Sequence, residues 1–155
     1  MSRPRKFDED DVVERAMEEF WTNGYAATSP ARLAEATGVA KGSLYNAFSS
    51  KRALFERCLD KYQQQIAKLA EGLMDHPGST RECLRDALRA VVDSDLAQAR
   101  RRGCLIGNTA VELAGDDSDL ARKIRKMQDE STSWFARRVE RGQREGDVRP
   151  DLDAA

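Results

Sequence analysis

One short segment of the chain carries side chains that can read the edges of DNA bases. Lys41, Ser43 and Asn46 lie close together in the sequence, with Tyr45 beside them. A lysine can donate to guanine or to a phosphate, and an asparagine can bind adenine through two hydrogen bonds. Because Gly42 has no side chain, the backbone at this point can approach DNA closely. These residue types in this order predict a segment that contacts DNA in the major groove.

Further polar residues flank this segment and are suited to phosphates. Thr28, Ser29 and Lys51 can hydrogen-bond or pair with phosphate oxygens, and Tyr45 can either do the same or pack in the core. Contacts of this kind fix the position of a protein on DNA without reading its sequence. Arg32 is either a further phosphate contact or simply an exposed charge.

The N-terminal residues form a basic arm. Arg3, Arg5 and Lys6 precede the first expected helix. Such an arm can follow the DNA backbone or enter the minor groove. The alternative is a solvated tail without a partner, and the sequence leaves both interpretations open.

A different chemistry is available at Cys104, which follows Arg100–Arg102 and Gly103. Positive charge and a helix N-terminus both lower the pKa of a thiol. A cysteine that senses electrophiles must be rich in thiolate and accessible, whereas a free cysteine is often buried and inert. A third interpretation makes Cys104 a catalytic nucleophile, but the only histidine, His76, stands far from it in the sequence. Because no histidine base is nearby, an enzyme is not expected.

The composition indicates a helical protein without cofactors or metals. Charged residues make up 34% of the 155 residues, and the net charge is −1. Ala, Leu, Glu, Arg and Lys, which favour helices, recur throughout. The three cysteines lie at wide spacings that match neither a disulfide framework nor a zinc site. No apolar run reaches the roughly 20 residues of a membrane span, and the N-terminus lacks the apolar core of a signal peptide, so a cytoplasmic protein is expected.

Apolar periodicity and capping residues predict an all-α chain. The expected helices cover residues 8–23, 30–37, 40–48, 51–75, 104–114 and 119–145, and a further helix opens at Ser79 or Thr80. His76-Pro77-Gly78 is a strong helix breaker. One apolar stripe is expected to pack against the core, and it consists of Phe55, Cys58, Leu59, Tyr62, Ile66, Leu69 and Leu73. In the helix that opens at Ser79 or Thr80, one face is expected to carry Leu84, Ala87, Leu88, Val91 and Val92.

Residues 28–51 read TSPARLAEATGVAKGSLYNAFSSK and resemble the DNA-binding domain of the TetR family. The resemblance extends over roughly residues 7–60 and implies a helix-turn-helix whose second helix, residues 40–48, enters the major groove. Ala40 and Ala47 depart from the family pattern, which often has a capping serine and a phosphate-contacting His or Tyr there. The matching positions are Ser29, Leu33-Ala34, Gly38-Val39, Lys41–Tyr45, Phe48 and Ser50-Lys51.

The resemblance also implies how the whole chain is organised. Residues 1–52 are expected to form the helix-turn-helix domain and residues 53–155 a helical effector-binding and dimerisation domain, with the helix 53–75 linking the two. Operator DNA is the expected partner, and the 119–145 helix is expected to join two copies as a homodimer. An unknown small-molecule effector would bind in a mostly apolar pocket. The candidate lining residues are Tyr62, Ile66, Cys104, Leu105, Asn108, Glu112, Met127 and Trp134.

The segment around Cys104, Arg-Gly-Cys-Leu, is similar to the one that carries the reactive cysteine in the family's N-ethylmaleimide-responsive repressor. The leading hypothesis is therefore a homodimeric repressor that a small apolar or electrophilic molecule releases from its operator. The alternative is a short interaction module that pairs with related regulators without binding an operator. It arises because the family usually continues beyond residues 148–152 into another helix, whereas this sequence ends at Ala155.

Overall fold

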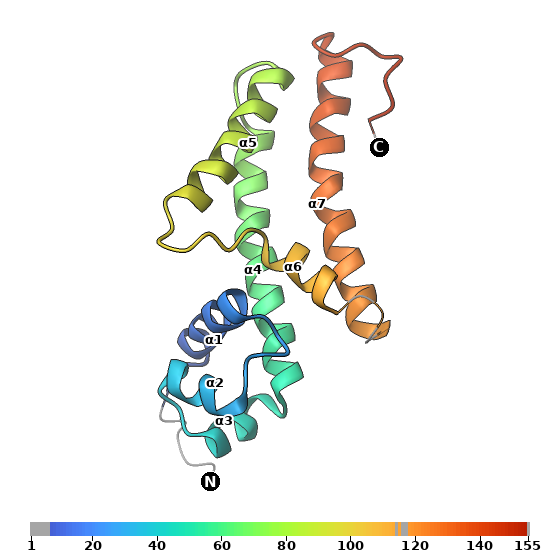
Figure 1. The fold of residues 1–155 in the computed structure, drawn as a ribbon. Helices are drawn as coiled ribbons and strands as arrows, with labels where there is room; N and C mark the ends of the chain where they lie inside the picture. Colours follow the sequence, from blue (N-terminus) through green and yellow to red (C-terminus); the bar gives the residue numbers. More distant parts are fainter. Residues whose placement is uncertain (1–6, 114, 116–117, 155) are drawn as a thin grey trace.

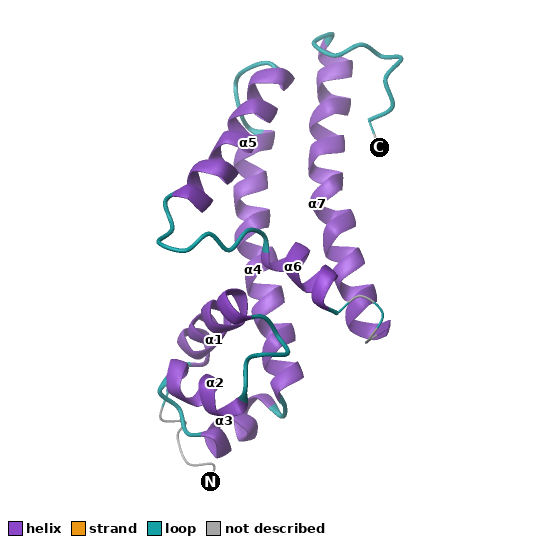
Figure 2. Ribbon diagram, in the orientation of Figure 1, coloured by secondary structure: helices purple, strands orange, loops and turns teal. Residues whose placement is uncertain are grey.

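The computed structural model describes residues 7–113, 115 and 118–154, and in this part of the chain it contains seven helices and no strand. Three short helices gather at one end, and the long helix α4 runs from them to the other end between α5 and α7 (Figures 1 and 2). The predicted all-α fold is confirmed. None of the described helices is long and apolar enough to cross a membrane. The helices are α1 (Glu9–Asn23), α2 (Pro30–Thr37), α3 (Lys41–Phe48), α4 (Lys51–Met74), α5 (Thr80–Leu96), α6 (Leu105–Glu112) and α7 (Ser118–Glu145).

The two helices of the helix-turn-helix begin differently, because α2 has a capping side chain and α3 has none. The Ser29 hydroxyl accepts a hydrogen bond from the amide of Arg32 at 3.2 Å, and Pro30 takes the first helical position of α2, where its missing N–H costs nothing. α2 ends at Gly38, whose φ of 69° glycine adopts without strain. α3 begins after Ala40, which makes no side-chain capping bond. A weaker start of this helix therefore stays a prediction.

One hydrophobic cluster connects this end of the molecule with the rest. Phe20 of α1 and Phe55 of α4 meet edge to face, with ring centres 4.8 Å apart, and Leu44 of α3 is buried in the same cluster. The cluster continues to Leu105 of α6 and Ile124 of α7. Each such side chain, fully buried, contributes about 1.5–3 kcal/mol. The cluster continues through α4 from one predicted domain into the other, so it does not mark a boundary between them. The division of the chain at residues 52 and 53 stays a prediction.

The far halves of α4 and α5 bury less apolar surface than the sequence predicts. Leu69 of α4 is 69% exposed. α5 packs through Cys83 and Ala87, whereas most of its larger apolar residues face away. The predicted core contact of Leu69 is wrong, because this side chain is exposed. Of the five α5 residues predicted on one face, Ala87 is buried. The exposed apolar residues of α5 are Leu88, Val91, Val92 and Leu96.

Polar contacts hold the end of α7 against the start of α5. The buried guanidinium of Arg138 donates to the Thr80 hydroxyl and to the Gly78 carbonyl, each at 2.8 Å. Gly142 lies so close that a Cβ there would be 2.1 Å from Oγ1 of Thr80. The Asp147 carboxylate accepts a hydrogen bond from the Thr80 amide, which lowers the pKa of Asp147. Thr80 is thus the point where three segments meet.

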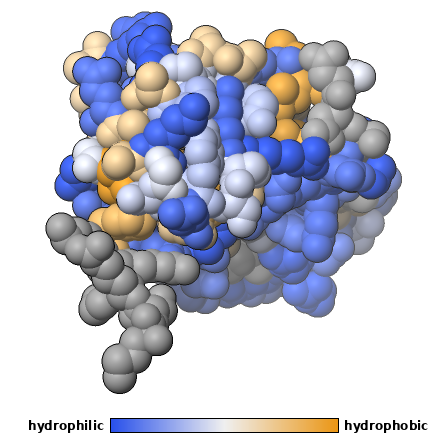
Figure 3. All heavy atoms as spheres, turned by 90° about the horizontal axis from the view of Figure 1, so that it is seen from below, coloured by the Kyte–Doolittle hydropathy of each residue, from blue (hydrophilic) through white to orange (hydrophobic). Residues whose placement is uncertain are grey.

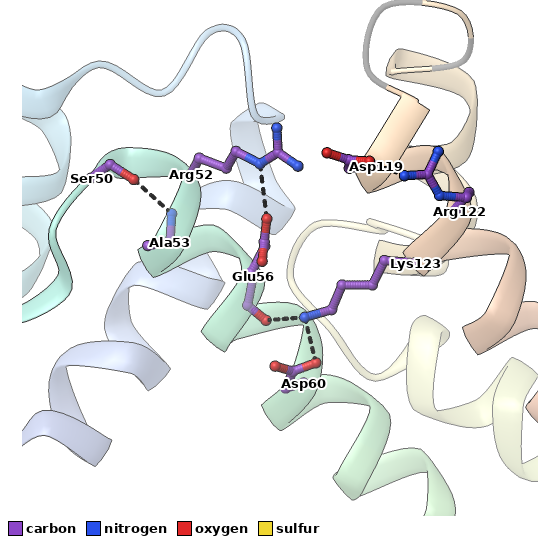
Figure 4. A network of polar contacts seen from close by, with 8 residues as sticks. All are labelled: Ser50, Arg52, Ala53, Glu56, Asp60, Asp119, Arg122 and Lys123. Atoms are coloured by element: carbon purple, nitrogen blue, oxygen red, sulfur yellow. Dashed lines mark hydrogen bonds and ion pairs between the residues drawn. The ribbon is translucent and has the colours of Figure 1, made fainter.

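A second polar network fixes the start of α7 beside α4 (Figure 4). The Lys123 ammonium lies 2.7 Å from the Asp60 carboxylate and donates to the Glu56 carbonyl at 3.4 Å. The carboxylate of Glu56 pairs with Arg52 one turn earlier, at 2.8 Å. Since these side chains are partly exposed, each pair contributes about 1 kcal/mol or less. Their main effect is to set the orientation of α7 relative to α4.

Candidate nucleic-acid interface

α3 presents an exposed polar face at the end of the molecule that carries the three short helices. Lys41, Gly42, Ser43 and Asn46 are exposed, whereas Leu44 on the opposite side of the helix is buried. A Cβ at Gly42 would meet nothing within 4 Å. Viewed from below, this end shows mostly hydrophilic and intermediate residues, with hydrophobic ones in small patches (Figure 3). α3 can therefore approach a duplex with its polar side chains toward the bases.

The start of α2 lies next to α3 and carries the predicted phosphate contacts. Ser29 and Arg32 are exposed, although Arg32 also pairs with Glu19 at 2.8 Å. Thr28 is fully buried, and its hydroxyl donates to the Gly24 carbonyl at 2.6 Å. A buried hydroxyl cannot reach a phosphate, so the predicted DNA contact of Thr28 is wrong. This residue stabilises the turn between α1 and α2 instead.

Tyr45 and Lys51 lie at the border of the exposed face and are partly buried. Burial raises the pKa of Tyr45. The Lys51 ammonium lies 4.4 Å from the centre of the Tyr25 ring. Burial lowers the pKa of Lys51, and the nearby carboxylate of Glu112 opposes this change. Phosphate contacts by both residues stay predictions.

The basic arm is the remaining part of the predicted interface. Arg5 and Lys6 belong to residues 1–6, which lie outside the described part of the chain, and their contacts stay predictions.

In the described part, α2 and α3 contact each other, as the two helices of a helix-turn-helix do.

In the described part of the chain, the residues predicted to line an effector pocket lie in different surroundings. Leu105 and Met127 are buried in the core, and Ile66 packs partly against it. Trp134 is partly buried. Asn108 is exposed and donates to a backbone carbonyl of the preceding loop at 2.6 Å. The composition of the effector site therefore stays a prediction.

Two hollows border α7. A groove of about 650 Å³ lies along the contact between α7 and α4. A smaller hollow of about 230 Å³ lies between α7 and α6. Of the predicted lining residues, Met127 borders the groove. The groove is lined by Asp60, Gln63, Gln64, Arg122, Lys123, Lys126, Met127 and Glu130. The smaller hollow is lined by Thr109, Ala110, Leu113, Gly115, Ala121, Ile124, Arg125 and Gln128.

Cys104 is the exposed thiol of the protein and begins α6. Its Sγ accepts a hydrogen bond from the Gly107 amide at 3.4 Å and shares another with Tyr62, whose pKa is raised mainly by burial. Cys58 and Cys83 are buried, and burial raises the pKa of Cys58. Among the described residues, no group of three or more His, Cys, Asp or Glu could hold a metal ion.

The loop before α6 is bound to α1 by contacts that the sequence did not predict. The Trp21 indole donates to the Gly103 carbonyl at 3.1 Å. The Arg102 guanidinium lies 4.0 Å from the centre of the Trp21 ring and pairs with Glu18. Tyr62 contacts the same indole edge to face, with ring centres 5.1 Å apart. Cys104 thus follows directly on a firmly held segment.

The other end of α6 is bound to the turn between α1 and α2 through Glu112. Its carboxylate accepts hydrogen bonds from the amides of Tyr25 at 2.9 Å and Ala26 at 2.6 Å. Glu112 was predicted to line an effector pocket, and neither hollow described above includes it. The bonded residues are 87 and 86 positions apart in the chain, so no local sequence pattern could reveal this contact.

Comparison with known proteins identifies the family. Residues 12–58 match the model of bacterial regulatory proteins of the tetR family, and residues 81–155 match the tetracyclin repressor-like C-terminal domain. The chain belongs to the TetR family. The resemblance carried by residues 28–51 is confirmed, and both parts of a TetR-family regulator are represented in this chain.

Two curated TetR-type relatives match almost the whole chain. The HTH-type transcriptional repressor ComR of Escherichia coli (strain K12) is 32% identical over 155 residues, which span 97% of this chain and 72% of ComR. The uncharacterized HTH-type transcriptional regulator YezE of Bacillus subtilis (strain 168) is 30% identical over 148 residues, which span 96% of this chain and 76% of YezE. These relatives regulate transcription, so this chain is a DNA-binding transcriptional regulator and not an enzyme.

A solved TetR-family structure has the same fold. The regulator CifR, as a cysteine mutant complexed with 26-bp operator DNA, superposes with a TM-score of 0.89 at 34% identity. The match covers 98% of this chain and 80% of that chain. The arrangement of α1 to α7 is thus one that this family uses.

Proposed function

We propose that this chain is a homodimeric repressor that reads its operator with α3 and is released by a small effector. The observation that carries the proposal is the exposed polar face of α3 beside the capped start of α2. Lys41 and Asn46 would contact base edges, and Ser29 with Arg32 would hold phosphates. ComR is a named repressor, and CifR is bound to operator DNA in its structure, which supports a repressor that binds an operator.

A homodimer would place two copies of α3 on one face of the DNA. Helix-turn-helix dimers bind half-sites about 34–36 Å apart, which is one turn of the duplex. The proposed contact between the copies is α7, the helix predicted over residues 119–145, on which Phe135 is 39% exposed. The operator of this protein is therefore expected to have two-fold symmetry.

Substitutions in α3 test the reading of DNA. Lys41→Ala and Tyr45→Phe should each weaken operator binding by about tenfold or more, because a good contact to a base or phosphate is worth about 1–3 kcal/mol. Glu71→Ala, at an exposed position of α4, is the control and should bind as the wild type does. Equal effects of all three substitutions would contradict the role of α3. A wild-type dimer that binds no operator would favour the interaction-module alternative.

For the effector, we propose that an electrophile acts at Cys104. With a quinone, the sulfur forms a bond to a ring carbon and the thiol proton ends on one quinone oxygen. The hydrogen of the attacked ring carbon then moves as a proton to the other quinone oxygen, which gives a hydroquinone thioether. The added group would occupy the space where Sγ contacts Tyr62 and the Gly107 amide. The start of α6 would then have to move. Accessibility of this thiol supports the proposal, since Cys58 and Cys83 are buried.

The cysteine proposal is tested by operator binding with and without a quinone. The wild type should lose binding on treatment, and Cys104→Ser should keep it. A matched control adds Ser94→Cys, an exposed position on α5, to the Cys104→Ser protein, and this new thiol should not restore the response. A response that persists in Cys104→Ser would contradict the proposal and direct attention to a non-covalent ligand.

A further inference from the structure

The last residue of α6 binds the backbone of the turn between α1 and α2. Both carboxylate oxygens of Glu112 are used, one by the Tyr25 amide at 2.9 Å and the other by the Ala26 amide at 2.6 Å. Hydrogen bonds to an ionised acceptor are about twice as strong as those between neutral groups. Because the two amides are consecutive, the carboxylate holds the turn in position and in orientation.

The turn is shaped to receive this carboxylate. Gly24 has a φ of 83°, and a Cβ there would lie 2.9 Å from Oε2 of Glu112. A side chain at position 24 would therefore both strain the backbone and push the carboxylate away. The Lys51 ammonium is near enough to Glu112 for their charges to interact. The carboxylate of Glu112 therefore also attracts the first residue of α4.

The held turn leads directly to the start of α2. The Thr28 hydroxyl donates to the Gly24 carbonyl at 2.6 Å, which closes the turn, and the next residue is Ser29, the cap of α2. We infer that Glu112 is a positioning residue for DNA binding, whose carboxylate fixes the start of α2 relative to α6. This inference rests on the proposed function, because the phosphate contacts are assigned to that start.

The inference is tested with Glu112→Asp, which keeps the charge but withdraws the carboxylate by about 1.5 Å, one carbon–carbon bond. Its affinity for the operator should fall about tenfold, within the range usual for coupling between sites. Its affinity for unrelated DNA should stay the same, because non-specific binding depends on charge rather than on alignment. Glu71→Asp is the same change at an exposed position of α4 and should leave both affinities unchanged.

Hydrogen exchange reports the contact itself. In Glu112→Asp the amides of Tyr25 and Ala26 should exchange at least about tenfold faster than in the wild type, because they lose their acceptor. Glu112→Gln keeps the length of the side chain and one acceptor oxygen. Its operator affinity, measured relative to that of Glu71→Gln, should therefore fall less than the affinity of Glu112→Asp does relative to Glu71→Asp. This second variant keeps the test decisive if Glu112→Asp folds poorly.

The outcomes separate this inference from the function on which it rests. Operator affinity in Glu112→Asp equal to that in Glu71→Asp, or exchange of the two amides unchanged, would overturn the positioning role of Glu112. An equal loss of operator and unrelated DNA binding would also overturn it, since that pattern indicates general destabilisation. A wild-type protein that does not bind its operator would overturn the proposed function itself.

Discussion

Asn46 and Arg32 offer two different kinds of contact to DNA. Asn46 lies on the exposed face of α3, whereas Arg32 lies at the start of α2. An amide side chain can match the donor and acceptor pattern of adenine, but a guanidinium beside the backbone attracts any phosphate. In the proposed complex, Asn46 would contribute to the choice of DNA sequence, and Arg32 would contribute to affinity for any DNA.

Substitution of these two residues should have distinguishable effects. Asn46→Ala should cost about 1–3 kcal/mol on the operator and relax the preference at one base pair, whereas Arg32→Ala should weaken binding to all sequences and reduce the salt slope by about 1. Binding to a set of operators with single base changes, at several salt concentrations, measures both effects. The same profile for both variants would contradict the assignment.

Two residues show where reasoning from sequence alone reaches its limit. Thr28 has a type and place suited to a phosphate contact, yet its hydroxyl is buried against the Gly24 carbonyl. Glu112 was placed in a pocket, yet it bonds to Tyr25 and Ala26. The partner of Thr28 lies four residues away in the same turn, so its burial could not be told from its residue type alone. The partners of Glu112 lie 87 and 86 positions away, and no local pattern encodes such a contact.

Among the helices, the ends were predictable and one buried face was not. Ser29 and Gly38 mark the limits of α2, because caps and left-handed glycines act within a few residues. The buried side of α5 depends on which neighbour it meets. There Cys83 and Ala87 are buried and Val91 is exposed, although all three are apolar.

The contact between α5 and α7 predicts opposite effects for two Gly→Ala substitutions. Gly142→Ala should destabilise the protein by about 1–3 kcal/mol or more, as overpacking does, because its Cβ would overlap Thr80 and Val148. Gly72→Ala in α4 is the matched control: a Cβ there meets nothing within 4 Å, and alanine should stabilise the helix by about 0.5–1 kcal/mol. Denaturant unfolding of both variants measures the difference, and equal effects would contradict the packing described.

Acid should weaken the same junction. The Thr80 amide lowers the pKa of Asp147 in the folded protein, so this carboxylate stabilises the fold above the ordinary carboxyl pKa. That contribution is lost as the pH falls through the lowered, folded-state pKa. Melting temperatures from about pH 6 to about pH 3 should fall more steeply for the wild type than for Asp147→Asn. Asp129→Asn, at an exposed position, should follow the wild type, and parallel curves for all three proteins would contradict the prediction.

The molecule as a whole carries a net charge of −1, so its attraction to DNA depends on where the charges lie. Lys41 and Arg32 are exposed at the DNA-reading end, and the basic arm with Arg5 and Lys6 precedes α1. α4 passes from this end into the effector half, so the two halves share one core. The helices of the chain could be predicted because they have clear periodicity, but the contacts that join them could not.

Salt should weaken binding strongly despite the acidic net charge. A dimer that contacts 6–10 phosphates loses about 10³–10⁵ in affinity between 50 and 200 mM salt, because neutralised phosphates release their counterions. Titrations of operator DNA at several salt concentrations measure the slope. A flat response would show that phosphates contribute little and would contradict an electrostatic footprint.

The most direct test is a mobility shift of the wild-type protein with the DNA upstream of its own gene. The same DNA with a shuffled sequence serves as the competitor. Sequence-specific DNA-binding proteins prefer their sites over other DNA by about 10³-fold or more, and a retarded band that resists shuffled competitor is the predicted result. Wild-type protein that binds both DNAs equally, or neither, at moderate salt would contradict the reading of an operator by α3.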